Sequence, residues 1–142
     1  MIIWIASYPK SGNTWVRSFL TAYYFCENGI FDIKKLNLIE DYPNKQFFKE
    51  KVKQGEIYKH WETSQKNIRD QKKVKFLKTH NSLITAFGND FTKPEYSLGV
   101  IYIIRDPRNV ITSVKNHNDL DSYDEALKFM QDENKVLQDY PH

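Results

Sequence analysis

The fold is decided by a stretch near the N-terminus, Ile2-Ile3-Trp4-Ile5-Ala6-Ser7-Tyr8-Pro9-Lys10-Ser11-Gly12-Asn13-Thr14-Trp15. The run Met1–Ala6 has no polar interruption, which is typical of a strand buried on both faces. Turn-forming residues fill Ser7–Asn13. Residues Thr14–Glu27 then show the spacing of a helix, which Asn28-Gly29 ends. One face of this helix is apolar and consists of Trp15, Phe19, Ala22 and Tyr23. The stretch therefore predicts a strand, a loop and a helix.

The same alternation continues along the chain. Short apolar strands are predicted at Val74–Lys78 and Gly99–Ile104, and helices at Arg108–Lys115 and Ser122–Tyr140. The regions between them predict two polar helices, Asn44–His60 and Glu62–Gln71, an unpatterned segment, Ile30–Pro43, and a loop-rich one, Asn81–Tyr96. Because apolar strands alternate with helices, we expect an α/β fold, a P-loop-like parallel β-sheet flanked by helices. No repeat or linker divides residues 1–142, so one domain is expected.

Composition excludes several classes of protein. The chain of 142 residues is 40% apolar and 15% aromatic, which is incompatible with intrinsic disorder. Its longest apolar opening run, Ile2–Ala6, is too short for a membrane span or a signal peptide. The single cysteine, Cys26, excludes an internal disulfide and a multi-cysteine metal site. A cytoplasmic location is the expectation.

Charge is unevenly distributed around a modest net value of +3. Lys45–Lys78 holds eleven Lys or Arg against four Asp or Glu, whereas Asp119–His142 holds two against seven. The basic segment could face an anionic ligand, such as a charged glycan, or be a solvated helix surface. Aromatic residues are interleaved with it only irregularly, so no nucleic-acid partner is expected.

The loop between the first predicted strand and the first predicted helix has the features of an anion-binding site. The first amides of a helix have no internal partner, and the helix dipole adds positive potential there. Lys10 adds a full charge, Gly12 permits close approach, and hydrogen-bonding side chains come from Ser11, Asn13 and Thr14. It is not a Walker A loop, because the lysine precedes the only glycine. The alternative is an ordinary turn with an exposed lysine.

Tyr8-Pro9-Lys10-Ser11-Gly12-Asn13-Thr14-Trp15 closely resembles the 5′-phosphosulfate-binding loop of the PAPS-dependent sulfotransferases (PAPS is 3′-phosphoadenosine 5′-phosphosulfate). The usual form there is Tyr-Pro-Lys-Ser-Gly-Thr-Thr-Trp, so only Asn13 differs. The resemblance implies that residues 10 to 14 bind the 5′ end of PAPS. It also implies that Trp15 offers a ring to the adenine; the alternative is a core tryptophan.

A second motif follows the third predicted strand. Arg105-Asp106-Pro107-Arg108-Asn109-Val110 places an arginine at a strand's carboxyl end, where open α/β sheets bind ligands, and Ser113 lies eight residues after Arg105. The planar guanidinium of an arginine can bind a phosphate through two parallel hydrogen bonds. An Arg–Asp ion pair at the surface would give the same sequence pattern. The segment is similar to the sulfotransferase motif for the 3′-phosphate, which implies that Arg105 and Ser113 bind that group.

A third motif, Lys78-Thr79-His80, ends the second predicted strand. Histidine is the usual proton acceptor near neutral pH, but most isolated histidines are surface or capping residues. The family has a Lys-Thr-His tripeptide here, which implies that His80 is the catalytic base and that Lys78 supports the sulfonate. The family often has proline two residues after the histidine, where this chain has Ser82.

The resemblance implies sulfuryl transfer from PAPS to a hydroxyl or amine of a small-molecule or glycan acceptor, with His80 as base, Lys10 stabilising the leaving group and no metal. Members of the family are longer, and their later Arg-Lys-Gly-x-x-Gly-Asp-Trp-Lys motif is absent here. We therefore expect the N-terminal part of a C-terminally incomplete sulfotransferase domain. The alternatives are an inactive fragment or anion-binding module, and a P-loop nucleotide kinase or NTPase. The acceptor and the oligomeric state are not indicated by the sequence.

Overall fold

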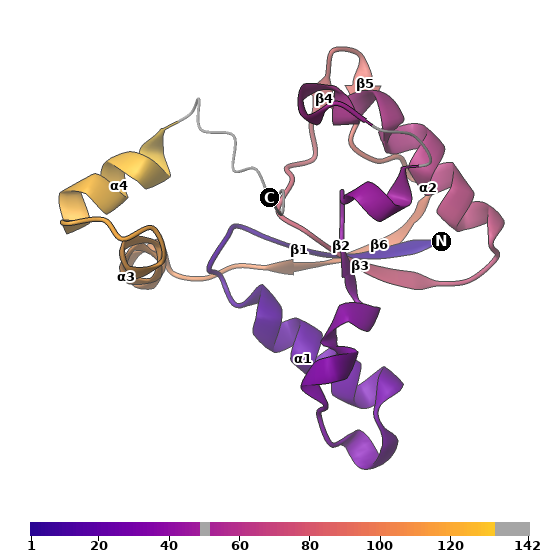
Figure 1. Ribbon diagram of the computed structural model, residues 1–142, viewed down its shortest axis with the longest axis horizontal. Helices are drawn as coiled ribbons and strands as arrows, with labels where there is room; N and C mark the ends of the chain where they lie inside the picture. The colour runs from indigo at the N-terminus through magenta and orange to yellow at the C-terminus, as the bar shows by residue number, and fades with distance from the viewer. Residues whose placement is uncertain (49–51, 133–142) are drawn as a thin grey trace.

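A four-stranded parallel sheet with helices on both sides organises the chain, as the α/β prediction expected (Figure 1). The computed structural model describes residues 1–48 and 52–132. The sheet has the order β2-β3-β1-β6 and is built from β1 (Ile2–Ser7), β2 (Glu40–Asp41), β3 (Lys75–Thr79) and β6 (Ser97–Ile103). The α-helices are α1 (Asn13–Phe25), α2 (Trp61–Asp70), α3 (Pro107–His117) and α4 (Tyr123–Gln131). A small hairpin pairs β4 (Thr85–Ala86) with β5 (Asn89–Asp90).

The layers place α1 on one face of the sheet, and α2 with the β4–β5 hairpin on the other (Figure 1). The main core lies on the α2 face, where Trp4 and Leu77 of the sheet meet Trp61 and Ile68 of α2. Buried residues of this core are Ile2, Trp4, Tyr42, Ile57, Trp61, Ile68, Leu77 and Phe91. A second, separate cluster joins α3 to α4 through Val110, Val114 and Ala126, and Tyr8 packs against it.

Strand β1 is the central strand, and it aligns the carboxyl ends of its neighbours. Ile5 pairs with Lys78 of β3 on one side and with Ile101 of β6 on the other. The chain goes from β1 to β2 and β3 on one side, and only later to β6 on the other side. The carboxyl end of β1 is thus a topological switch point, the place where open α/β sheets bind ligands.

The intervening segments differ from the prediction. Asn44–His60 is not one α-helix: its described residues form two 3-10 helices, Lys45–Phe47 and Gln54–His60, and residues 49–51 lie outside the described part. Two other 3-10 helices are Glu27–Gly29 and Ile33–Leu38. The strands β2, β4 and β5 have two residues each, too few to leave a periodic signal. Of the predicted helix Ser122–Tyr140, the end beyond Asp132 lies outside the described residues.

Helix α1 turns its polar side, not its apolar side, toward the protein. Its buried residues are Asn13, Arg17 and Thr21, whereas Trp15 is 73% exposed and Phe19 69% exposed. The reason is tertiary: the Arg17 guanidinium donates to the carbonyl oxygens of Leu36 (3.3 Å) and Ile39 (2.6 Å). No helix among residues 1–48 and 52–132 has the length and apolar character to cross a membrane.

Candidate functional site

The loop between β1 and α1 bends through two left-handed residues. Lys10 has φ 65° and Gly12 has φ 106°, and α1 starts directly after, at Asn13. Gly12 is the N-cap and has no side chain that could accept from the first helical amides. A Cβ built at Gly12 would have no atom within 4 Å, so the space in front of the helix end is open. This geometry suits an anion bound by backbone amides.

The loop side chains that the sequence predicts to bind the ligand are of two kinds, buried and exposed. Ser11 and Asn13 are buried, and the Asn13 amide donates to the Ile5 carbonyl (3.1 Å) and to the Ser7 hydroxyl (3.2 Å). Asn13 therefore anchors the loop to β1 instead of pointing outward. Thr14 and Trp15 are exposed at the start of α1, so Trp15 is not a core residue.

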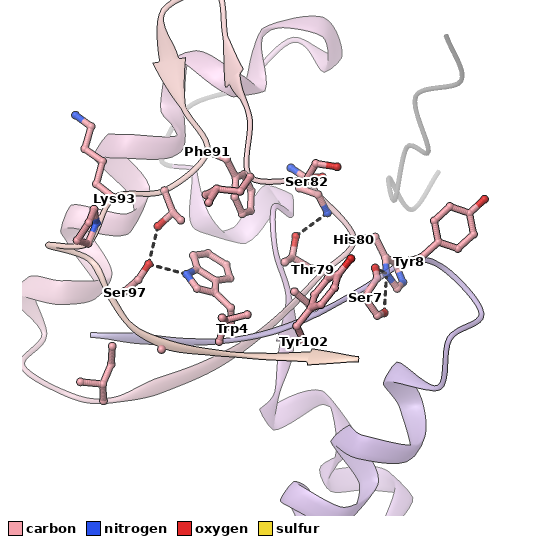
Figure 2. A pocket seen from close by; sticks show the side chains of 18 residues that line it. Trp4, Ser7, Tyr8, Thr79, His80, Ser82, Phe91, Lys93, Ser97 and Tyr102 are labelled. Carbon is pink, nitrogen blue, oxygen red and sulfur yellow. Dashed lines mark hydrogen bonds between the residues drawn. The ribbon is translucent and has the colours of Figure 1, made fainter. Parts of the chain in front are cut away.

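His80 is oriented by Ser7 at the carboxyl ends of β1 and β3. Its Nδ1 lies 2.7 Å from the Ser7 carbonyl oxygen and 3.3 Å from the Ser7 hydroxyl (Figure 2). Because a carbonyl oxygen can only accept, Nδ1 must carry the hydrogen and donate it. In the neutral imidazole the lone pair then belongs to Nε2, the nitrogen that could take a proton.

Arg105, which follows β6, contacts the β1–α1 loop on the side of β1 opposite to β3. Its Nη1 donates to the Lys10 carbonyl at 3.0 Å, so the first and second motifs are in direct contact. Arg108, in contrast, pairs with Asp106 at 2.6 Å and is exposed, and this pairing lowers the pKa of Asp106. Asp106 also caps α3, whose Ser113 is half-buried. Within the motif, Arg105 is the arginine placed at the loop.

Lys78 is close to the site but on the other face of the sheet. Its Nζ lies 3.6 Å from Asp41, which also pairs with Arg17 at 3.2 Å. Burial lowers the pKa of Arg17, and the charge of Asp41 opposes that shift. Lys78 is thus engaged with an acidic residue of β2 beneath α1, while His80 lines a pocket on the α2 face.

The pocket has a volume of about 730 Å³ and extends from His80 across the sheet surface (Figure 2). Strand residues Trp4, Val100 and Tyr102 form one side, and Phe91 and the segment after His80 form another. Tyr8 of the loop also contributes, and its burial raises its pKa. None of the described residues of the basic segment, 45–48 and 52–78, lines this pocket.

Sequence reasoning missed Ser7 as a site residue. In the sequence it is one of several turn-forming residues, but in the structure its carbonyl and hydroxyl connect His80 with Asn13. The only signal in the sequence was its position, directly before Tyr8 at the end of an apolar strand. A contact between residues 73 apart cannot be read from local patterns.

Comparisons with known proteins point to one family. Residues 2–140 match the family model described as the sulfotransferase domain, which argues against the kinase or NTPase alternative. Searches of curated proteins and of solved structures gave no significant match. Among residues 1–48 and 52–132, no three His, Cys, Asp or Glu side chains gather as metal ligands would. The chain belongs to the sulfotransferase domain family.

Proposed function

We propose that the chain transfers a sulfuryl group from PAPS to the hydroxyl or amine of an acceptor. The observation that carries the proposal is the contact of all three motifs at one sheet edge. Ser7 bonds to both Asn13 of the loop and His80, and Arg105 bonds to the loop carbonyl of Lys10. These hydrogen bonds connect the residues that we assign to the donor site with the residue that we assign as the base, which supports the proposal.

His80 is the proposed base. With Nδ1–H donated to Ser7, Nε2 takes the acceptor's proton as the acceptor oxygen or nitrogen bonds to sulfur. The bond from sulfur to the bridging phosphate oxygen breaks in the same displacement, and the products are the sulfated acceptor and PAP (3′-phosphoadenosine 5′-phosphate). Ser7 acts as a positioning residue, because it fixes the ring that receives the proton.

The loop is the proposed site for the 5′ end of PAPS. The amides at the start of α1, with Ser11, Gly12 and Thr14, would bind the 5′-phosphate, and Lys10 would stabilise charge on the bridging oxygen. The open space in front of Gly12 supports this assignment. Asn13 holds the loop to β1 by its bonds to Ile5 and Ser7.

The nucleoside end of PAPS is assigned to three residues. Arg105 and Ser113 would bind the 3′-phosphate, and the exposed ring of Trp15 would contact the adenine. Lys78 is assigned a supporting role near the sulfonate, which requires it to leave or share its pairing with Asp41.

Thermal unfolding with nucleotides tests the donor site. A ligand at 100 times its Kd stabilises a folded protein by about 2.7 kcal/mol, so saturating PAP should raise the Tm by several degrees. AMP and ATP with Mg²⁺ are the controls and should give smaller shifts. Transfer of labelled sulfate from PAPS to a panel of phenols, sugars and amines tests the reaction. An increase in Tm with ATP alone would favour an NTPase. No change in Tm with any of the nucleotides would favour an inactive module.

A further inference from the structure

Arg105 contacts the backbone of the β1–α1 loop, in addition to the role assigned to it at the 3′-phosphate. Its Nη1 donates to the Lys10 carbonyl oxygen at 3.0 Å. We infer, on the basis of the proposed function, that Arg105 is a positioning residue for Lys10: its guanidinium holds the carbonyl and so keeps the loop bent around the 5′ end of the donor. This role is separate from binding of the 3′-phosphate and applies equally to a ligand that lacks it.

Lys10 has a backbone conformation that a residue with a side chain does not favour. Its φ is 65°, in the left-handed region, where the Cβ of an L-residue is crowded by backbone atoms. Gly12, the other left-handed residue of the loop, has φ 106° and no Cβ, so the bend is unstrained there. A side chain persists in this region when surrounding contacts hold its backbone. The bend at Lys10 therefore depends on contacts with the rest of the protein.

The turn that contains Lys10 explains why a contact is needed at this residue. The Ser11 amide donates to the Tyr8 carbonyl oxygen at 3.2 Å, so residues 8 to 11 form a hydrogen-bonded turn. With Pro9 second and a left-handed residue third, it has the features of a type II turn, whose third position usually holds glycine or asparagine. Here the third residue is Lys10, and its carbonyl accepts from Arg105. A hydrogen bond from a charged donor is stronger than one between neutral groups.

The Arg105 guanidinium has further donors for a phosphate. It carries five N–H groups, and within residues 1–48 and 52–132 its only hydrogen bond is the one to Lys10. Arg105 can therefore hold the Lys10 carbonyl and a phosphate at the same time. Arg108 is also exposed, but its Nε and Nη2 donate to Asp106 at 3.1 and 2.6 Å. Arg108 is thus a control of the same residue type, three residues away.

A second contact joins the same turn to the α3 side of the molecule. Tyr8 packs against the cluster that Val110, Val114 and Ala126 form between α3 and α4. The first and the third residue of the turn are thus both held by the part of the chain that follows β6. Because Tyr8 and Asn13 keep their own contacts, loss of the Arg105 hydrogen bond should change the bend at Lys10 without unfolding the loop.

Binding of AMP to the full chain tests the inference, because AMP has a 5′-phosphate and no 3′-phosphate. Arg105→Ala should weaken AMP binding about threefold, since the loop that binds the 5′-phosphate loses one hydrogen bond. Arg108→Ala should leave AMP binding unchanged. Isothermal titration gives the Kd values. If Arg105 served only the 3′-phosphate, Arg105→Ala would leave AMP binding unchanged, and that result would overturn the inference.

Two substitutions at Lys10 separate positioning from charge. Lys10→Ala and Lys10→Gly both remove the ammonium group, but only glycine adopts the left-handed conformation without crowding. Arg105→Ala should still weaken AMP binding about threefold in the Lys10→Ala protein, but less than about 1.5-fold in the Lys10→Gly protein. The same loss in both proteins would mean that Arg105 acts through its charge alone, contrary to the inference.

Hydrogen exchange of the protein without nucleotide keeps the test independent of the donor site. A peptide that covers residues 8–13 should exchange about threefold or more faster in Arg105→Ala than in Arg108→Ala, because the bend at Lys10 is released. Equal exchange in the two variants would refute the positioning role. If the native protein bound neither PAP nor AMP, the donor site would be removed, and the exchange comparison would still decide whether Arg105 holds Lys10.

Discussion

At the residue scale, Ser7 shows how a backbone carbonyl can decide the chemistry of a side chain. Its carbonyl oxygen lies 2.7 Å from His80 Nδ1 and can only accept, so it selects one tautomer of the ring. The hydroxyl of the same residue also bonds to Asn13. A shift of the β1–α1 loop would therefore be transmitted to the ring of His80.

Replacing His80 by alanine tests the proposed base. His80→Ala should lower kcat by about 10² to 10⁴-fold, because general-base catalysis contributes that range. PAP binding should stay within about twofold, since the proposed PAP site is the loop between β1 and α1, whereas His80 lines the pocket on the α2 face. Measurement of kcat together with the Kd for PAP checks both. Normal turnover in this variant would remove the base assignment.

Arg105 and Arg108 form a matched pair for the 3′-phosphate assignment. Arg105→Ala should weaken PAP binding about tenfold or more, but AMP binding less, because AMP lacks the 3′-phosphate. Arg108→Ala should leave both nucleotides unchanged, because Arg108 is exposed and paired with Asp106. Isothermal titration with the two nucleotides gives the comparison. Equal losses for PAP and AMP in Arg105→Ala would contradict the assignment.

At the element scale, α1 is fixed to the sheet by a buried arginine. Arg17 donates to Leu36 and Ile39 carbonyls and pairs with Asp41 of β2, so one side chain holds three segments together. This explains why β2 lies beside β3 although it has only two residues. It also explains why the aromatic side of α1 faces away from the protein.

Arg17→Met should therefore destabilise the fold. The change removes the guanidinium donor from the Ile39 carbonyl oxygen and leaves the Leu36 carbonyl oxygen with the Ile39 amide alone, and the expected loss in the free energy of unfolding is about 2 kcal/mol or more. Lys59→Met is the control: it removes an exposed ion pair with Glu56 and a contact with the Tyr58 ring, and exposed pairs of this kind contribute little to stability. Urea unfolding followed by circular dichroism measures the difference. A cost for Arg17→Met no larger than for Lys59→Met would show that the guanidinium contacts add little.

At the scale of the whole molecule, the two hydrophobic clusters predict unequal local stability. Among residues 1–48 and 52–132, the α3–α4 cluster has three buried residues, whereas the core beside β1 has eight, and β1 is hydrogen-bonded on both sides. Elements with fewer buried contacts open more readily. We expect amides of α3 and α4 to exchange hydrogen about tenfold or more faster than those of β1. Mass spectrometry of labelled peptides measures this; uniform protection along the chain would contradict it.

Hydrogen exchange measured with and without bound PAP tests the proposed 3′-phosphate site. Arg105 lies between β6 and α3, and Ser113 lies within α3, so PAP bound by these residues should slow exchange in α3 more than in α2. An equal change in both helices would argue against a 3′-phosphate site at this segment. The comparison uses one sample and needs no substitution.

The sequence by itself determined the alternation of apolar strands with helices, and with it the α/β sheet. It also determined the three motifs, because each is a short run of residues at a strand end. The tertiary structure decided the rest: the direction of α1, the 3-10 segments in place of one helix at Asn44–His60, and the pairing of Lys78 with Asp41. It also decided the link from Asn13 through Ser7 to His80, and the apolar lining of the pocket. The physical reason is range: periodicity and turn chemistry are local, whereas a buried arginine, a tautomer and a pocket depend on atoms that only the folded sheet brings together.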